Sequence, residues 1–385
     1  MTKDKRQFWL ASADLVGSII GVGIFGVPYA ISRVGLVPAL AFFFVLGGIQ
    51  LLQHFYLAEA AMACPDKLRL SGLVARYVGP RARWVAAVAN VCGLWVGMVA
   101  YIIVGGEFLA NLLRPFVGGE VFAYQIAWAL GATAVIYFSL NVVTRLGFVT
   151  VSALILAFLL IFARSIPAVR GVNLVLFDIK DVFLPYGVLL FSLSGYPAIL
   201  EMEDILEGKH ERYRRAVLVG SLVGAFLTLA FGLVVFGVTG AATTEDAVTG
   251  LKAVLGGNIA TLAALLGFLA IVNCYLRVGV YLRHTFQYDF KLRRPFAWLL
   301  ATAVPVGVFL LGTKSFVSMI SFSGAVFGGV TAIMIVLLYL AVARKEKLDQ
   351  PPLRVPRSLA YVAIVILGAG AVYEVADSFA KLWRP

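Results

Sequence analysis

Long apolar runs recur along almost the whole chain and are separated by short polar loops. A helix that crosses a bilayer needs about 20 mostly apolar residues, since each residue adds about 1.5 Å along the axis. Eleven stretches meet this requirement, so we predict eleven membrane-spanning helices in one compact domain. The predicted spans are residues 8–32, 35–63, 84–112, 121–144, 146–163, 181–203, 214–240, 253–283, 295–313, 315–343 and 357–377.

The first and sixth spans share an interruption. Residues 14–28 read DLVGSIIGVGIFGVP and residues 186–201 read YGVLLFSLSGYPAILE, so each apolar span contains glycine near its middle, followed by proline. A break inside a bilayer frees backbone N–H and C=O groups that lipid cannot satisfy, so it is tolerated only where it lines a cavity. Paired breaks in two halves of a chain indicate the binding site of a secondary transporter built from inverted repeats.

Composition supports a membrane protein. The chain is 61% hydrophobic and only 14% charged, and its mean hydropathy is +0.95. A water-soluble domain carries about a quarter charged residues, which argues against a soluble fold. The first span is too long for a cleaved signal peptide, lacks a small-residue cleavage site and contains Asp14 in its first half.

The net charge of +12 does not indicate nucleic-acid binding, because the basic residues gather in alternate loops. With the amino terminus in the cytoplasm, 22 lysines and arginines fall on the inner side and 9 on the outer side. This bias is what the positive-inside rule expects. We therefore expect a protein of the cell inner membrane, beside anionic lipid, with the amino terminus inside and the carboxyl terminus outside.

Enzyme chemistry has little support in the sequence. We find no phosphate loop, zinc-protease helix motif or nucleophile elbow. Cys64, Cys92 and Cys274 have no metal or redox spacing and are interpreted as small packing residues. His54 lies in the second span, where a packed polar role is favoured over a proton-carrying one. We expect a protein that is not an enzyme and uses no cofactor or metal.

The glycines of the first break have a direct physical interpretation. Glycine at positions 17, 21 and 23 lets the chain leave helical geometry. Pro28 has no backbone N–H, so it removes one helical hydrogen-bond donor about a turn later. N–H groups at the start of the second half-helix, with its dipole, suit a carboxylate, while carbonyls ending the first half-helix suit an ammonium or a metal ion. The alternative is a close-packing face for a neighbouring helix, but the matching sixth-span break favours binding.

Three segments carry a family resemblance. Residues 17–28, GSIIGVGIFGVP, resemble the first-helix signature of the amino acid–polyamine–organocation superfamily. Residues 100–109 and 191–201 are similar to the corresponding segments of the amino acid/auxin permease branch and of the bacterial aromatic amino acid permeases. Residues 321–329 are compatible with the same resemblance. The resemblance covers the whole chain in span count, and none of its motifs is specific to a substrate.

The resemblance implies an all-α polytopic membrane protein with a leucine-transporter-like fold, in which helices 1 and 6 are broken. Residues 1–163 would form the first inverted repeat, residues 181–343 the second, and residues 357–377 a peripheral eleventh helix. Rocking of spans 1, 2, 6 and 7 against the rest would open a central site to each side in turn.

The same resemblance implies a substrate with an α-carboxylate and an α-amine. The carboxylate would meet backbone N–H groups around Gly21, Val22 and Gly23, and the amine would meet carbonyls of the two broken helices. Aromatic residues would wall or gate the pocket, although a packing role is equally open for each of them. The predicted substrate-binding residues are Gly17, Ser18, Ile20, Gly21, Val22, Gly23, Tyr101, Phe191, Ser192, Ser194 and Phe322.

Charged residues inside spans are costly and are candidates for ion coupling. Glu201 is the first choice, because a buried carboxylate can take up a proton near neutral pH; a static ion pair with an arginine is the alternative. Sodium-coupled members of the superfamily hold the ion between the first and eighth spans. Here the eighth span offers Asn273 and Cys274, which are poor ligands, with Arg277 one turn on. The coupling candidates are Glu201, Arg277, Asp14, Glu107 and Asn273.

The sequence therefore predicts a permease that moves amino acids by alternating access, with neutral or aromatic amino acids as substrates and proton coupling. A sodium-coupled or uncoupled exchanger remains open, which leaves symport and antiport as alternatives. A membrane amino acid sensor that binds but moves little substrate is an alternative of another class. A channel is disfavoured, because two broken helices suit an occluded site better than a continuous pore.

Overall fold

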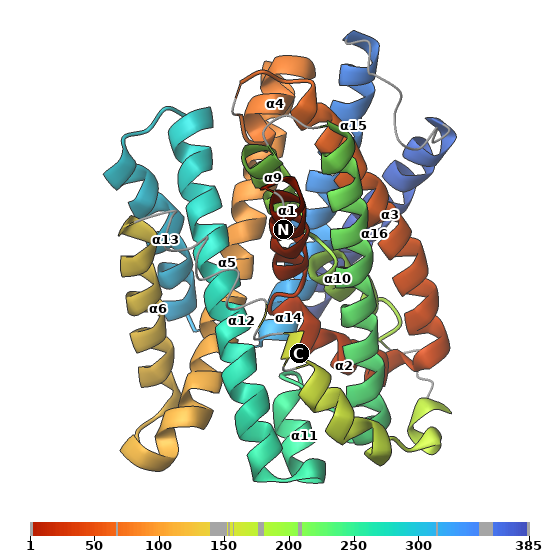
Figure 1. Cartoon of the computed structure of the whole chain (residues 1–385), viewed down its shortest axis with the longest axis vertical. Helices are drawn as coiled ribbons and strands as arrows, with labels where there is room; N and C mark the ends of the chain where they lie inside the picture. The colour runs from red at the N-terminus through yellow and green to blue at the C-terminus, as the bar shows by residue number, and fades with distance from the viewer. Residues whose placement is uncertain are drawn as a thin grey trace.

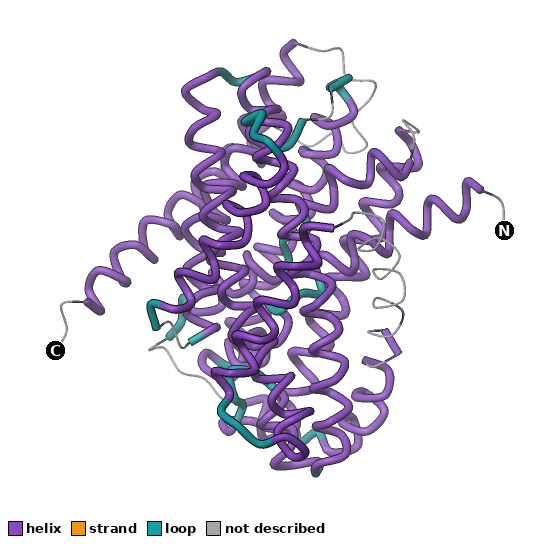
Figure 2. The backbone as a smooth tube through the Cα atoms, turned by 90° about the vertical axis from the view of Figure 1, so that its left-hand side faces the viewer, coloured by secondary structure: helices purple, strands orange, loops and turns teal. Residues whose placement is uncertain are grey.

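The computed structural model describes residues 3–66, 68–138, 152, 155–156, 158–175, 181–206, 210–312, 315–345 and 357–382. Every regular element within these ranges is a helix (Figures 1 and 2). Half of the predicted fifth span, residues 146–163, lies outside the described residues.

Six helices in the described part of the chain are each long and apolar enough to cross a bilayer. Their apolar residues face lipid as well as the protein interior, so these helices carry no narrow apolar stripe. They are α3 (Leu36–Met62), α5 (Pro80–Val117), α10 (His210–Thr239), α12 (Gly257–His284), α14 (Phe316–Phe322) continued by α15 (Gly329–Lys345), and α16 (Arg357–Leu382).

Both predicted interruptions are confirmed. The first span consists of α1 (Lys3–Ile19) and α2 (Gly23–Val34), which meet at an angle of 48°. The sixth consists of α8 (Leu184–Ser192) and α9 (Tyr196–Leu206). The non-helical residues are 20–22 in the first span and 193–195 in the sixth, and they include Gly21, Ser194 and Gly195 of the sequence motifs.

Shorter elements complete the described chain. The apolar helices α6 (Val121–Phe138) and α13 (Arg294–Leu310) correspond to predicted spans, and a further apolar helical segment covers Phe158–Ala168. The 3₁₀ turns are η1 (Ile166–Ala168), η2 (Gly171–Val175) and η3 (Gly240–Ala242), and the π segments are η4 (Thr285–Asp289) and η5 (Ser323–Gly328).

Two short helices were not predicted, α4 (Leu70–Tyr77) and α11 (Val248–Leu255). The predicted eighth span begins at residue 253, whereas α12 begins at Gly257. Gly256, with φ of 90°, separates α11 from α12, and this backbone conformation suits glycine because it has no Cβ.

The helix α4 is held by the end of α12. The Asp289 carboxylate accepts hydrogen bonds from the backbone N–H groups of Arg69 (3.0 Å) and Gly72 (2.9 Å), which satisfies donors at the start of α4. The Arg69 guanidinium donates to the Leu200 carbonyl of α9 at 3.1 Å. The α9 half of the sixth span is thereby tied to the start of α4 and, through Asp289, to the π segment that follows α12.

The broken first span occupies the middle of the bundle (Figure 1). The helix α1 packs against α9, α10 and α12, and α2 packs against α8 and α10. The long helix α5 lies against α12 and η5. The helix α16 packs on α15 and η5, and its Tyr373 stacks on Phe183 with ring centroids 4.0 Å apart. Both breaks therefore lie at the centre of the molecule.

Candidate functional site

The two breaks touch each other. A Cβ built on Gly23 would lie 2.8 Å from the Cα of Ser192 and 2.6 Å from its Oγ. Only glycine permits this approach, because any side chain at position 23 would push the two half-helices apart. The short non-helical segments 20–22 and 193–195 consequently form one region of irregular backbone.

Backbone groups at the first break are only partly satisfied. The N–H of Gly21 donates to the carbonyl of Ile19 at 2.9 Å. The N–H groups of Val22 and Gly23 find no backbone carbonyl within the described part of the chain. They stand at the start of α2, where the helix dipole adds positive potential, so they suit an anion.

The carbonyls that end α1 face a thiol of α12. The Cys274 Sγ–H donates to the carbonyl of Gly17 at 3.2 Å, and the Ile20 carbonyl lies 3.6 Å from the same sulfur. Cys274 is buried, as the sequence interpretation of small packing cysteines expects. The structure gives it a polar contact in addition, because freed carbonyls inside a bilayer need a donor.

The second break is held by two polar side chains of α3. The Gln50 Nε2–H donates to the Leu190 carbonyl at 2.7 Å. The Gly195 N–H donates to His54 Nε2 at 3.0 Å, so this nitrogen carries no proton and the ring is neutral. His54 Nδ1–H then donates to Ser221 Oγ of α10 at 2.8 Å. His54 is therefore a packed polar residue with a defined task, which is to satisfy the Gly195 N–H.

A cavity of about 770 Å³, counting its opening, lies against both breaks. Its lining on α5 runs from Ala89 to Tyr101, a length of about 18 Å at 1.5 Å per residue, so it extends from the breaks toward the end where α5 begins. The wall includes the aromatic residues Tyr101, Phe191, Tyr196 and Phe327 and the polar residues Ser18, Gln50, Gln53, Ser192, Ser194, Ser323 and Thr331.

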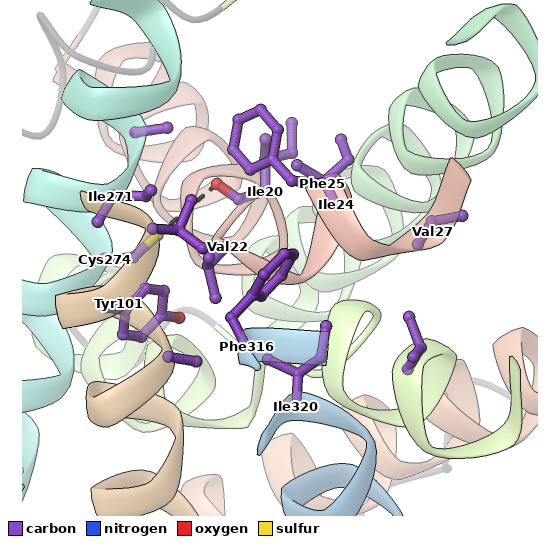
Figure 3. Close-up of a cluster of buried hydrophobic side chains, with 14 of the residues drawn as sticks. Ile20, Val22, Ile24, Phe25, Val27, Tyr101, Ile271, Cys274, Phe316 and Ile320 are labelled. Atoms are coloured by element: carbon purple, nitrogen blue, oxygen red, sulfur yellow. Dashed lines mark hydrogen bonds between the residues drawn. The ribbon is translucent and has the colours of Figure 1, made fainter. Parts of the chain in front are cut away.

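On the other side of the breaks, packed apolar side chains surround the start of α2 (Figure 3). Phe25 of α2 makes edge contacts with Phe108 of α5 and Phe231 of α10, at centroid distances of 5.1 and 5.7 Å. Phe316 and Ile320 of α14 lie beside α2 in the same cluster. The breaks therefore sit between a packed half of the bundle and a half that contains the cavity.

The cavity brings together seven of the predicted substrate-binding residues. They are Ser18, Gly21, Gly23, Tyr101, Phe191, Ser192 and Ser194. Four others do not line it: the Gly17 carbonyl faces Cys274, the Ile20 and Val22 side chains belong to the packed apolar cluster, and Phe322 packs edge-on against Phe327. For Val22 the backbone N–H remains relevant, since its side chain points into the cluster while its amide lies at the break.

Several wall residues were missed from the sequence. Gln50 and Gln53 are buried amides in an otherwise apolar span, a costly pattern that was available as a signal. Phe327 reaches the wall through the π segment η5, which the hydrophobic pattern does not reveal. Gly93 and Gly97 also line the cavity, four residues apart on α5.

A second, smaller cavity of about 300 Å³, again counting its opening, adjoins the first and shares Ser18, Tyr101, Pro197 and Val278 with it. Glu201 and Arg277 line it. The Arg277 guanidinium forms an ion pair with Asp14 of α1 and donates to the Asn273 side-chain oxygen at 3.1 Å. Four of the five coupling candidates therefore gather in and around this cavity.

Glu107, the fifth coupling candidate, lies on α5 beyond Tyr101 and lines neither of the two cavities. Among the described residues, no group of three or more His, Cys, Asp or Glu side chains lies close enough together to hold a metal ion.

Comparison with known proteins decides the family. Residues 4–376 match the tryptophan/tyrosine permease family. The chain belongs to that family. It is therefore a multi-pass membrane permease for amino acids and not an enzyme. Two relatives from Haemophilus influenzae are named tyrosine-specific transport systems 1 and 2. They are 21% and 22% identical, over 92% and 91% of this permease and 92% and 90% of their own lengths.

Solved structures agree with the helical architecture. A complex of MhsT with L-phenylalanine superposes with a TM-score of 0.65, at 14% identity, covering 95% of this permease and 98% of that chain. The nucleobase-cation-symport-1 transporter Mhp1, closed on bromovinylhydantoin, gives a TM-score of 0.62 at 11% identity, covering 88% and 79%. At these identities the likeness concerns the fold alone, and it is the predicted leucine-transporter-like fold.

Gly21 offers a test of the first break. A Cβ at this position would lie 2.9 Å from the Tyr101 hydroxyl and 3.3 Å from Cys274 Sγ, contacts that side-chain movement can relieve. We predict that Gly21→Ala still folds but binds aromatic amino acids about tenfold or more weakly, since the methyl group intrudes on the backbone at the break. Isothermal titration of purified protein measures this, with Gly48→Ala as the control. Wild-type affinity in Gly21→Ala would contradict the site.

Proposed function

We propose that this permease carries tyrosine or tryptophan across the inner membrane by alternating access, through the cavity at the two breaks. The observation that carries this proposal is the pair of N–H groups of Val22 and Gly23, which lie at the start of α2 beside a cavity walled by aromatic rings. An amino acid presents one carboxylate, one ammonium and one side chain, and the site offers a complement to each.

The backbone of the breaks recognises the part common to all amino acids. The substrate carboxylate accepts hydrogen bonds from the Val22 and Gly23 N–H groups and is favoured by the α2 dipole. The Tyr101 hydroxyl, next to Gly21, adds a donor to the same carboxylate. The ammonium binds carbonyl oxygens at the ends of the half-helices α1 and α8, near Ser18 and Ser192, where the dipoles are negative.

The cavity wall selects the side chain. Tyr101, Phe191, Tyr196 and Phe327 present rings to the cavity, and aromatic pairs gain about 0.5–1.5 kcal/mol beyond burial of their area. The names of the Haemophilus relatives and the L-phenylalanine complex of MhsT support an aromatic substrate. Together they favour the aromatic amino acid permeases over the amino acid/auxin permease branch.

Orientation follows from the basic loops. With the amino terminus in the cytoplasm, the cavity extends toward the inner side, because α5 begins there at Pro80, so the structure corresponds to an inward-facing state. We also propose residues 1–163 and 181–343 as the inverted repeats, with residues 357–377 outside them, since the two breaks lie five spans apart and face each other.

Coupling to protons is favoured over coupling to sodium. The carbonyls of Gly17 and Ile20 face the Cys274 thiol, which is a weak donor and a poor ligand for a hard cation. The fixed charge of Arg277 lies one turn further along the same helix. Glu201, in the cavity that adjoins the substrate site, is the group that would bind the proton.

Uptake into proteoliposomes tests the substrate and the driving ion together. We predict that an inward proton gradient drives accumulation of labelled tyrosine or tryptophan and that replacing sodium with choline changes the rate less than twofold. Strict dependence on sodium would contradict the coupling proposal. Exchange without net accumulation would indicate an uncoupled exchanger. Binding without any flux would indicate a sensor.

Substitution of Glu201 separates proton coupling from substrate binding. We predict that Glu201→Gln abolishes accumulation driven by the proton gradient but retains exchange of internal and external substrate, because the neutral amide keeps the shape and cannot carry a proton. Glu107→Gln is the matched control, since this carboxylate lies outside both cavities. If Glu201→Gln accumulates substrate like the wild type, Glu201 is not the proton site.

A further inference from the structure

Two of the aromatic rings that wall the cavity rest on glycines of α5. A Cβ built on Gly97 would lie 3.1 Å from Cε2 and 3.3 Å from Cζ of Phe191. A Cβ built on Gly93 would lie 2.8 Å from the Cβ of Phe327. These contacts are tighter than ordinary van der Waals separations of 3.5–4.0 Å between carbon atoms. The Phe191 ring and the Cβ of Phe327 therefore occupy space that side chains on α5 would fill.

Gly93 and Gly97 share one face of α5, because residues four apart in a helix are neighbours on its surface. Phe191 comes from the end of α8 and Phe327 from the π segment η5, so the face receives rings from two separate elements. All four residues line the main cavity. The two glycines therefore let the Phe191 ring and the Cβ of Phe327 pack close against α5, which leaves more of the cavity empty.

We propose that the Gly93–Gly97 face of α5 sets the size of the side-chain pocket and so determines selectivity for aromatic over smaller substrates. A methyl group at position 97 would take up cavity space itself and would move the Phe191 ring away from α5. Both effects reduce the room for a large side chain and leave the backbone contacts at Val22 and Gly23 unchanged. The proposal rests on the proposed function, since it concerns the same site.

Gly97 is the better position to test. Its methyl group would meet the far edge of the Phe191 ring, which can shift by a few tenths of an ångström. A methyl group at Gly93 would instead meet the Cβ of Phe327, which is fixed close to the backbone of η5, so Gly93→Ala endangers folding as well as the pocket.

The experiment measures dissociation constants of purified full-length protein for tryptophan, tyrosine, leucine and alanine. We expect Gly97→Ala to weaken the binding of tryptophan and tyrosine about tenfold or more, the usual effect of one misplaced methylene in an apolar pocket. The dissociation constants for leucine and alanine should rise less than threefold or fall, so the ratio of aromatic to aliphatic affinity falls. Gly48→Ala is the control, since a methyl group there meets no described atom within 4 Å, and it should keep wild-type ratios.

The double variant Gly97→Ala/Phe191→Leu separates pocket size from general damage. Leucine is smaller than phenylalanine and can yield to the new methyl group, so adding Gly97→Ala to Phe191→Leu should weaken tryptophan binding at least threefold less than adding it to the wild type. An equal loss of affinity for all four amino acids in Gly97→Ala, or the same loss of tryptophan affinity on the wild-type and Phe191→Leu backgrounds, would overturn the proposal that this face sets the pocket size, while aromatic transport by the wild type still stands. Failure of the wild type to bind any aromatic amino acid would overturn the proposed function and the pocket-size proposal together.

Discussion

A chain that leaves helical geometry inside a bilayer exposes N–H and C=O groups that lipid cannot satisfy, and the centre of this permease is organised around that constraint. Each buried group left without a partner costs about 1–3 kcal/mol. Side chains of neighbouring helices supply many of the partners: His54 accepts from Gly195, Gln50 donates to Leu190 and the Cys274 thiol faces the end of α1. The Val22 and Gly23 N–H groups have no backbone acceptor among the described residues, and in our proposal they bind the substrate.

This arrangement links binding to the packing of the broken helices. The breaks touch at Gly23 and Ser192, so a ligand that bonds to the first break also fixes its position against the second. His54 of α3 and Ser221 of α10 hold the second break, so the sixth span is tied to both of these helices. Alternating access then needs only the displacement of packed half-helices around a site whose chemistry stays constant.

Much of the fold and part of the site could be predicted from the sequence, for identifiable reasons. Span positions follow from local hydrophobicity, and the breaks at Gly21 and Gly195 follow from glycine in apolar runs, because both signals are local. The remaining features of the site depend on contacts between residues far apart in the sequence, which local patterns do not reveal. The role of His54 depends on a break more than 140 residues away, and Phe327 reaches the cavity because η5 adopts a π conformation. Gly256, which separates α11 from α12, shifted one predicted span by a few residues.

The central claim is that the unsatisfied N–H groups of the first break bind the substrate carboxylate. An experimental structure of the permease with bound tyrosine or tryptophan, at a resolution that orients the ligand, tests this most directly. The account predicts carboxylate oxygens about 2.7–3.2 Å from the backbone nitrogens of Val22 and Gly23, with the ring among Tyr101, Phe191 and Phe327. A carboxylate bound instead to a charged side chain such as Arg277, with the first break unoccupied, would contradict it.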